Sequence, residues 1–487
     1  MNLLPFALVA YLVLQFGIAF FASRFIKGEA DYFVAGRKLG VFAVAMSVFA
    51  TWFGAEAVVG ASGAVAEQGL AAGSADPFGY TLCLLAMATF VAYKLREAGV
   101  MTFVDFFRER FGPMASTLAA VLSIPSSLFW ASAQLLALGY VVSEVTTLDL
   151  MTCLAIATVV IVAYTAVGGL FGDVITDIVQ GSILIVGLVV LLIAVLASND
   201  FSLANVRPEQ LSFIARDDTG APVSLLATLN TWMIPIVGSL VVQEAISRFL
   251  GATSPSVART GCYLAAGLYL VIGSIPVIIG LLGAAAGFVP DGGADQFLPQ
   301  LAQQYLDPIL YVIVMGALVS AILSTVDTTL LAISAIATRN LVEPAAPNLS
   351  QTNRVRVGRV ITALTGVAAF FTAASGESIQ GLVEIASSFG SAGIVVALMF
   401  GLHSRLGDER AAVAALLAGV AMSFFGNGVV SWGYSLFAGE EAAAALPWYF
   451  QANDESGYVV AVLAALVAYV GVAMLTARGA RRVVAAE

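Results

Sequence analysis

The sequence predicts an all-α protein that crosses a membrane many times. Apolar residues fill 60% of the 487 positions and charged residues 11%, against about 45–50% and about 25% in typical soluble domains. Apolar runs long enough for a membrane helix, which needs about 20 residues, recur along the chain. These observations exclude a disordered chain, a nucleic-acid binder and an ordinary soluble enzyme. Unbroken runs such as 183–197 argue against a transmembrane barrel, whose strands alternate over about ten residues.

We expect about thirteen spans within a single membrane domain. The first run has no basic segment before it and is too long for a cleavable signal peptide, so it is interpreted as a span. The spans are expected at about 3–23, 40–66, 75–95, 114–146, 150–168, 173–198, 225–249, 259–288, 308–338, 357–375, 379–402, 410–432 and 456–477.

The basic residues predict how these spans are oriented, because Lys and Arg are enriched in cytoplasmic loops. With the N-terminus outside and the C-terminus in the cytoplasm, all 21 Lys and Arg residues except Arg207 and Arg216 fall on the cytoplasmic side. An even number of spans would spoil this alternation. The net charge of −10 then describes a molecule that is basic inside and acidic outside, in the plasma (inner) membrane.

Few residues could support metal or catalytic chemistry of the common kinds. The three cysteines lie singly in apolar runs, which makes a disulfide framework or a zinc site improbable. His403 is the one histidine, and the chain has no nucleophile motif, so we expect no enzyme.

Four acidic residues stand within predicted spans, where a charge is costly and usually functional. They are Glu56, Asp177, Asp327 and Glu384. The alternative is a structural acid that pairs with a helix end or a buried Arg. For Glu244 an ordinary helix pair with Arg248, four residues on, is at least as good an interpretation.

The surroundings of these acids favour ligand sites. Ser324, Asp327 and Thr328 share one helix face and, with Thr325, offer hydroxyls and a carboxylate to a monovalent cation. Back-bonding of these hydroxyls to the helix is the alternative. Gly54 precedes Glu56 in mid-span, which suggests a broken helix of the kind that secondary transporters use.

Aromatic residues form a third group. Trp52, Tyr80 and Trp130 fall inside different spans, whereas Trp and Tyr usually lie at membrane interfaces. An aromatic box beside an acid would suit a cationic ligand through cation–π attraction. The sequence leaves open whether the three side chains meet.

The chain resembles the sodium:solute symporter family from about residue 30 to 430. The residues that carry the resemblance are 31–37 (DYFVAGR), 164–170 (YTAVGGL) followed by 176–180 (TDIVQ), and 320–325 (SAILST). The resemblance implies a five-plus-five inverted-repeat transporter with broken helices. Residues 1–39 would be an extra helix and loop, 40–198 repeat one, 225–402 repeat two and 403–487 two further helices.

The resemblance also implies ion sites. A coupling sodium would be held by the carbonyls of Ala50, Phe53 and Ala321 and the hydroxyls of Ser324 and Thr325. A second cation or a proton would lie at the positions Asp177, Ser324, Asp327 and Thr328.

Within the family the residues look most like choline transporters, whose caging aromatics would map to Trp52, Tyr80 and Trp130. A fourth Trp is missing from the stretch 240–244, where we place Gln243 at the substrate site, and Glu56 replaces a small residue. Both departures favour a smaller amine or a hydroxylated solute over choline.

The expected function is therefore sodium-coupled import of a small organic solute by alternating access, with a cationic amine favoured. Symport of a sugar, an amino acid or a monocarboxylate is the alternative, and a solute sensor built on the transporter fold is a further one. The expected partners are the solute, sodium as coupling ion and the lipid bilayer, without an organic cofactor or nucleic acid. Oligomeric state, stoichiometry and the choice between sodium and proton stay open.

Overall fold

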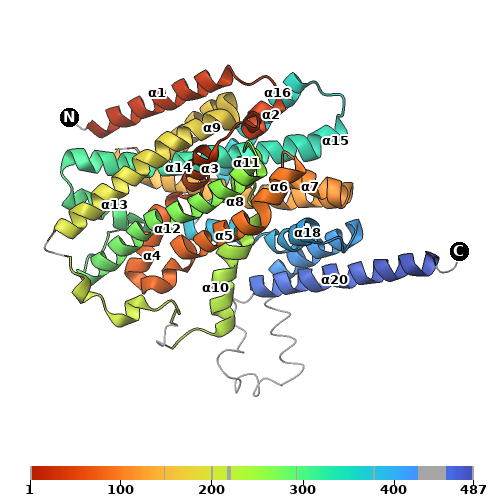
Figure 1. Ribbon diagram of the computed structural model, residues 1–487. Helices are drawn as coiled ribbons and strands as arrows, with labels where there is room; N and C mark the ends of the chain where they lie inside the picture. Colours follow the sequence, from red (N-terminus) through yellow and green to blue (C-terminus); the bar gives the residue numbers. More distant parts are fainter. Residues whose placement is uncertain are drawn as a thin grey trace.

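Helices account for nearly all residues of the computed structural model, which describes residues 3–146, 148–198, 201–216, 221–291, 293–376, 379–425 and 457–484 (Figure 1). Within these ranges the only β pairing consists of two isolated bridges, Leu39 with Ala252 and Arg216 with Pro222. The prediction of an all-α chain is confirmed.

The helices are numbered in chain order. In the first half they are α1 (Leu3–Ser23), α2 (Glu29–Val34), α3 (Val41–Trp52), α4 (Ala61–Gln68), α5 (Tyr80–Ala86), α6 (Ala92–Ala98), α7 (Phe103–Arg110), α8 (Pro113–Val145) and α9 (Leu150–Ala197). In the second half they are α10 (Leu225–Val237), α11 (Gln243–Leu250), α12 (Pro255–Ala285), α13 (Phe297–Tyr305), α14 (Pro308–Ile336), α15 (Glu343–Ala345), α16 (Gln351–Ala374), α17 (Ile379–Ser388), α18 (Ser391–His403) and α20 (Gly457–Val484). Residues 409–425 are also helical.

Eight helical runs among the described residues are long and apolar enough to cross a membrane, and nine if the bent pair of α10 and α11 is one span. The difference from thirteen has three sources. The spans at 3–23 and 40–66 begin with α1 and α3, of which only the short apolar helices Val13–Ser23 and Val41–Trp52 are counted. Those at 150–168 and 173–198 form one run. The span at 410–432 lies outside the described residues beyond 425. Thirteen therefore stays a prediction.

The two spans that merge are separated by a kink in α9. A straight helix of its 48 residues would be about 72 Å long, more than twice the roughly 30 Å of a hydrocarbon core. Gly169 breaks it with φ of 56° and ψ of −174°. A Cβ atom there would lie 2.7 Å from the Tyr32 ring, so both the turn and the close packing require glycine.

Two other spans are broken where the backbone leaves helical geometry. After α3, Phe53 has φ of −86° and ψ of 65°, and a π-helical turn over Glu56–Gly60 leads into α4. The break that Gly54 predicted is therefore present. Between α10 and α11, Val242 is extended and the two helices are bent by 44°. Such breaks free backbone groups that a continuous helix would use.

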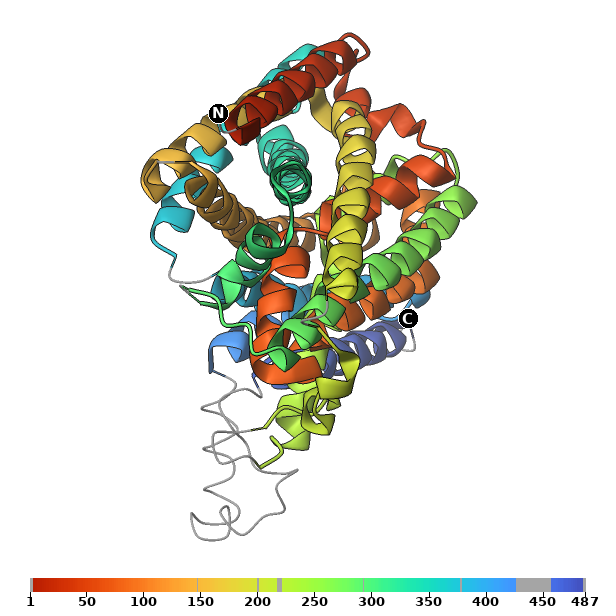
Figure 2. The ribbon, with the colours of Figure 1, turned by 90° about the vertical axis from the view of Figure 1, so that its left-hand side faces the viewer.

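Helix α14 lies in the interior of the bundle. All of its residues from Leu318 to Ile336 are buried, and it packs against α8, α9 and α16. In Figure 2 it is seen nearly end-on, in blue-green, with α1 and α9 around it. The broken helix α3 packs on α9, α12 and α14. Polar side chains on α14 therefore face neighbouring helices and not lipid.

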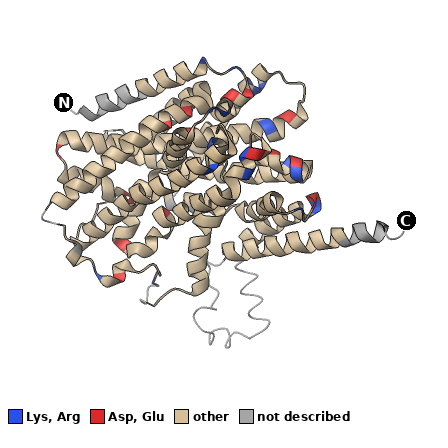
Figure 3. Cartoon of the chain, in the orientation of Figure 1, with Lys and Arg blue, Asp and Glu red and all other residues tan. Residues whose placement is uncertain are grey.

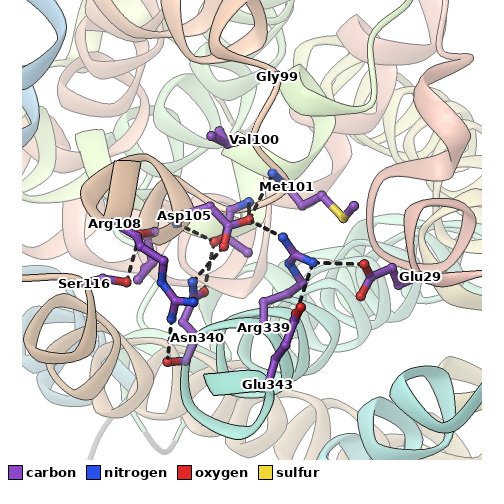
Figure 4. Close-up of polar contacts among 12 residues, drawn as sticks. Glu29, Gly99, Val100, Met101, Asp105, Arg108, Ser116, Arg339, Asn340 and Glu343 are labelled. Carbon is purple, nitrogen blue, oxygen red and sulfur yellow. Dashed lines mark hydrogen bonds and ion pairs between the residues drawn. The ribbon is translucent and has the colours of Figure 1, made fainter. Parts of the chain in front are cut away.

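Charged residues gather at one end of the bundle, around α7, α15 and α18 (Figure 3). There Arg339 pairs with Glu29 at 2.9 Å, Asp105 at 3.3 Å and Glu343 at 3.1 Å (Figure 4). Arg354 also pairs with Glu29 and Glu343. These pairs connect α2, α7 and the start of α16 to the turn that follows α14.

Candidate functional site: the broken helices and the acids around them

The break after α3 is held open by a side chain from α8. Gln134 accepts a hydrogen bond from the Ala55 backbone N–H through its Oε1 at 2.8 Å. A Cβ atom on Gly54 would meet that same oxygen at 2.5 Å and the Thr325 hydroxyl at 3.0 Å. The Trp52 carbonyl, also freed by the break, accepts a hydrogen bond from the Tyr269 hydroxyl at 3.2 Å. The irregular backbone is thus satisfied by neighbouring helices, as membrane interiors demand.

Of the residues predicted for the first sodium site, Ser324 on α14 bonds Ala50 on α3, whereas Thr325 bonds back to its own helix, the alternative that the sequence left open. The Ser324 hydroxyl donates to the Ala50 carbonyl at 2.8 Å, and the Thr325 hydroxyl donates to the Ala321 carbonyl at 3.2 Å. Ala50, Phe53, Ala321, Ser324 and Thr325 are all at most 2% exposed. A carbonyl and hydroxyl set beside an unwound helix is the donor chemistry that sodium takes in such transporters.

The residues predicted for the second ion site also meet, and an arginine lies among them. Arg248 from α11 donates to Asp173 at 2.6 Å, to Asp177 at 3.0 Å and to the Thr328 hydroxyl. Its Nε donates to the Ser47 hydroxyl at 3.0 Å. Arg248 is 1% exposed, so its assignment to a cytoplasmic loop was wrong.

Three carboxylates face this one guanidinium. Asp327 accepts the Thr328 N–H at 2.7 Å, and its carboxylate lies beside those of Asp173 and Asp177. Asp177 accepts from Ser324 at 2.9 Å, so the hydroxyl that contacts Ala50 also contacts this group of acids. Since Arg248 offsets one negative charge, two remain to be balanced by protons or cations.

The three aromatic side chains singled out in the sequence are in contact. The Tyr80 ring centroid lies 5.7 Å from that of Trp52 and 6.3 Å from that of Trp130. The Tyr80 hydroxyl is 3.4 Å from both carboxylate oxygens of Glu56. The question that the sequence left open is therefore settled: the aromatic group and Glu56 form one cluster.

A second acid joins this cluster. Asp76 accepts a hydrogen bond from the Tyr269 hydroxyl through one oxygen, while its other oxygen is buried without a hydrogen-bond partner. Asp76 is 3% exposed. Among the described residues no Lys or Arg forms an ion pair with Glu56 or Asp76.

A narrow cavity opens beside the aromatic cluster. Its wall includes Trp52, Trp130, Gln243 and Glu244, with serines from three segments. Gln243 contributes its surface, but both ends of its amide are already bonded: Oε1 accepts the Phe103 N–H at 3.0 Å, and Nε2 donates to Ser247 at 2.9 Å. Gln243 thus lies in the wall, and its polar atoms join α11 to α7.

The sequence interpretation missed Gln134, Tyr269 and the role of Arg248. A helix pair between Glu244 and Arg248 was wrong, because that guanidinium bonds Asp173 and Asp177 and takes only the backbone carbonyl of Glu244 at 3.1 Å. One clue was present in the sequence. An arginine in a predicted span needs an acidic partner, and Asp173 and Asp177 had not been assigned a basic partner.

Comparisons with known proteins agree with this architecture. The profile of the sodium:solute symporter family matches residues 32–419. The chain is 27% identical to the human high affinity choline transporter 1 over 415 residues, which cover 81% of this chain and 70% of that protein. It is 26% identical to the sodium/proline symporter of Haemophilus influenzae over 457 residues, covering 88% of each.

Solved structures show the same fold. A Na⁺-coupled sialic acid symporter, described in a substrate-bound outward-open state, superposes with a TM-score of 0.77 at 15% identity and covers 96% of each chain. The sodium/glucose cotransporter of Vibrio parahaemolyticus is a further relative, 25% identical over 454 residues, which cover 85% of this chain and 83% of that protein. The family profile covers well over half of this chain, and the chain therefore belongs to the sodium:solute symporter family.

Proposed function

We propose that this membrane symporter uses sodium to import a small organic cation, with the Trp52, Tyr80 and Trp130 cluster as its binding site. The observation that carries the proposal is that these rings contact one another and that the Tyr80 hydroxyl lies 3.4 Å from Glu56, an acid without a basic partner among the described residues. Aromatic faces attract cations, and a buried carboxylate calls for one. The choline transporters among the relatives support this choice.

Sodium would be coordinated where α3 breaks against α14, by the carbonyls of Ala50, Phe53 and Ala321 and the hydroxyls of Ser324 and Thr325. Trp52, which faces the solute, lies between two of these carbonyls in the chain. Sodium binding would therefore order the same short segment that completes the solute site. Shared ordering of one segment couples two ligands, since the first to bind lowers the cost for the second.

A second monovalent cation or a proton would lie at the acids around Arg248. Its ligands would be oxygens of Asp177, Ser324, Asp327 and Thr328. The three carboxylates outnumber the one arginine, and this excess of negative charge supports the binding of a cation or a proton there. Because Arg248 already contacts Asp177 and Thr328, Asp327 is the acid with the most capacity left for a cation.

The protein would lie in the plasma (inner) membrane with its N-terminus outside, its C-terminus in the cytoplasm and its solute moving inward. The charged end in Figure 3 supports this orientation. The breaks after α3 and after α10 support repeat boundaries at 40–198 and 225–402, because inverted repeats place a broken helix at matching positions.

Import of a neutral hydroxylated solute is the second candidate. Six serines line the cavity and could bond a sugar: Ser123, Ser126, Ser127, Ser239, Ser387 and Ser391. The sodium/glucose relative supports this alternative. It leaves Glu56 without a function, which is why the cationic solute is preferred.

A thermal-shift screen of the purified chain tests the proposal. Choline, simple amines, betaines, amino acids, sugars and monocarboxylates are compared with and without sodium. We expect a rise in melting temperature with amines that requires sodium, because a ligand stabilises the state it binds. A rise with sugars or carboxylates alone would contradict the cationic solute.

The role of sodium is tested by uptake into liposomes. Ser324→Ala should abolish the sodium dependence of amine uptake. Ser274→Ala is the matched control, because its hydroxyl bonds only within its own helix, to Leu270 at 2.7 Å. Equal sodium dependence in both variants would contradict the assigned coordination.

A further inference from the structure

Glu244 is a buried acid that the proposed cation site does not yet use. It is 1% exposed and lines the cavity with Trp52 and Trp130. Neither of its carboxylate oxygens has a hydrogen-bond partner that meets ordinary geometry, although the Ser127 hydroxyl and the backbone of Glu244 itself interact with the carboxylate. A buried carboxylate in this state is costly, so a partner from outside the chain is to be expected.

Arg248 acts on Glu244 through its charge but forms no ion pair with it. It lies one turn further along α11, and its guanidinium bonds Asp173, Asp177 and Ser47. In the described part of the chain Glu244 takes part in no ion pair. Its position in the first turn of α11 favours the ionised carboxylate through the helix dipole when a cation is bound. Glu244 therefore lines the cavity as an acid without a salt-bridge partner among the described residues.

The rest of the wall indicates what kind of cation fits. Trp52, Trp130 and Phe389 supply aromatic surface, and Ser123, Ser126 and neighbouring serines supply hydroxyls. This mixture suits a small organic cation that carries a hydroxyl group. A bare metal ion would instead need several oxygens converging on one point, and the aromatic surface provides none.

We propose that Glu244 accepts a hydrogen bond from the cationic nitrogen of the solute, so that the transporter selects amines with N–H groups over quaternary ammonium compounds. The inference rests on the proposed import of a cationic solute and narrows its substrate class. A ring face attracts any cation, whereas a carboxylate gains most from a donor that forms a short charge-assisted hydrogen bond. A quaternary nitrogen has no such donor.

The test uses four solutes that differ only in methylation of the nitrogen: ethanolamine, its N-methyl and N,N-dimethyl derivatives, and choline. All four are cations at neutral pH and share the hydroxyethyl arm. Affinity is measured by calorimetry on the purified full chain with saturating sodium. We expect ethanolamine to bind about tenfold more tightly than choline, since a hydrogen bond to a charged group contributes about that factor.

Glu244→Gln should bring the ratio of the two affinities to within about threefold, because the charge is lost while the shape is kept. Glu209→Gln, on an exposed 3₁₀ turn, is the matched control and should leave the ratio unchanged. Sodium-induced stabilisation shows that each variant is folded. If Glu244→Gln does not fold, the ratio of ethanolamine to choline affinity in the wild-type chain tests the inference by itself.

Two results separate this inference from the proposal on which it rests. Choline binding as tightly as ethanolamine, or a folded Glu244→Gln variant with an unchanged ratio, would overturn the role of Glu244 and leave cation import standing. Binding of sugars or carboxylates in place of every amine in the series would overturn both.

Discussion

Two groups of buried acids lie in this protein, and they differ in what balances their charge. In the arginine-balanced cluster, Asp173, Asp177 and Asp327 face Arg248. The base-free acids, Glu56, Asp76 and Glu244, have no ion pair among the described residues. The first group is part of the fold's own polar network, whereas the second meets aromatic rings or a cavity.

Because of this difference, we expect the two groups to have different functions. The arginine-balanced cluster is joined by Ser324 to the carbonyl of Ala50, so changes there should act on the fold and on sodium. The base-free acids lie beside Trp52, Tyr80 and Trp130, so changes there should act on the solute. Helix α11 carries a member of each group, Arg248 and Glu244, one turn apart.

Removal of the arginine should have the largest effect. Arg248→Met leaves three carboxylates in a dry interior, and losing one partner of a buried ion pair costs about 3–5 kcal/mol. We expect a large drop in the free energy of unfolding, measured by thermal unfolding in detergent. Arg356→Met, at an exposed position, is the control. If Arg248→Met lost no more stability than the control, the claim that Arg248 balances charge in this cluster would be contradicted.

Asp177→Asn should weaken sodium binding by about tenfold, since it replaces a charged acceptor of the Ser324 hydrogen bond with a neutral one. Sodium titration of the purified chain, followed by its stabilisation, measures the change. Asp291→Asn, in an exposed loop, should have no effect. If sodium affinity were unchanged in Asp177→Asn, the claim that sodium binds next to Ser324 and Asp177 would be contradicted.

Gln134→Leu tests the break after α3, which both groups of acids share. The variant leaves the Ala55 N–H buried without its acceptor, at a cost of about 1–3 kcal/mol. Sodium and solute affinities should therefore fall together. Ser132→Ala in the same helix removes only a bond to Leu128 and should change neither. Loss of one affinity without the other would contradict a shared segment.

The smallest effect is expected at the charged end of the bundle, remote from both groups. Glu343→Gln weakens the ion pairs with Arg339 at 3.1 Å and Arg354 at 2.9 Å. Its side chain is 22% exposed, so we expect a loss of about 1 kcal/mol or less in stability. Sodium and solute affinities should be unchanged. A changed affinity would show that these pairs take part in the transport cycle.

The sequence predicted the elements of this protein well. Hydrophobic runs and the loop positions of Lys and Arg located most spans, and Gly54 located the break after α3. The kink at Gly169 is consistent with the two predicted spans on either side of it. These features depend on local composition and spacing, which a single sequence contains.

The partners of the buried acids could not be predicted in the same way. Arg248 and Asp173 are 75 residues apart, and Tyr269 and Asp76 are 193 apart. Which side chains meet over such separations depends on how the helices pack. Charge alone misled at Arg248, because it lies near a predicted span end yet is 1% exposed. The family resemblance brought Asp177, Ser324 and Thr328 together, since it supplied the packing.

The central claim is that the arginine-balanced cluster serves sodium and the base-free acids serve the solute. The most direct test measures both ligands on two variants, sodium without solute and ethanolamine at saturating sodium. Asp177→Asn should lose sodium affinity and keep ethanolamine affinity, and Glu244→Gln should show the reverse. Loss of the same ligand in both variants would contradict the account.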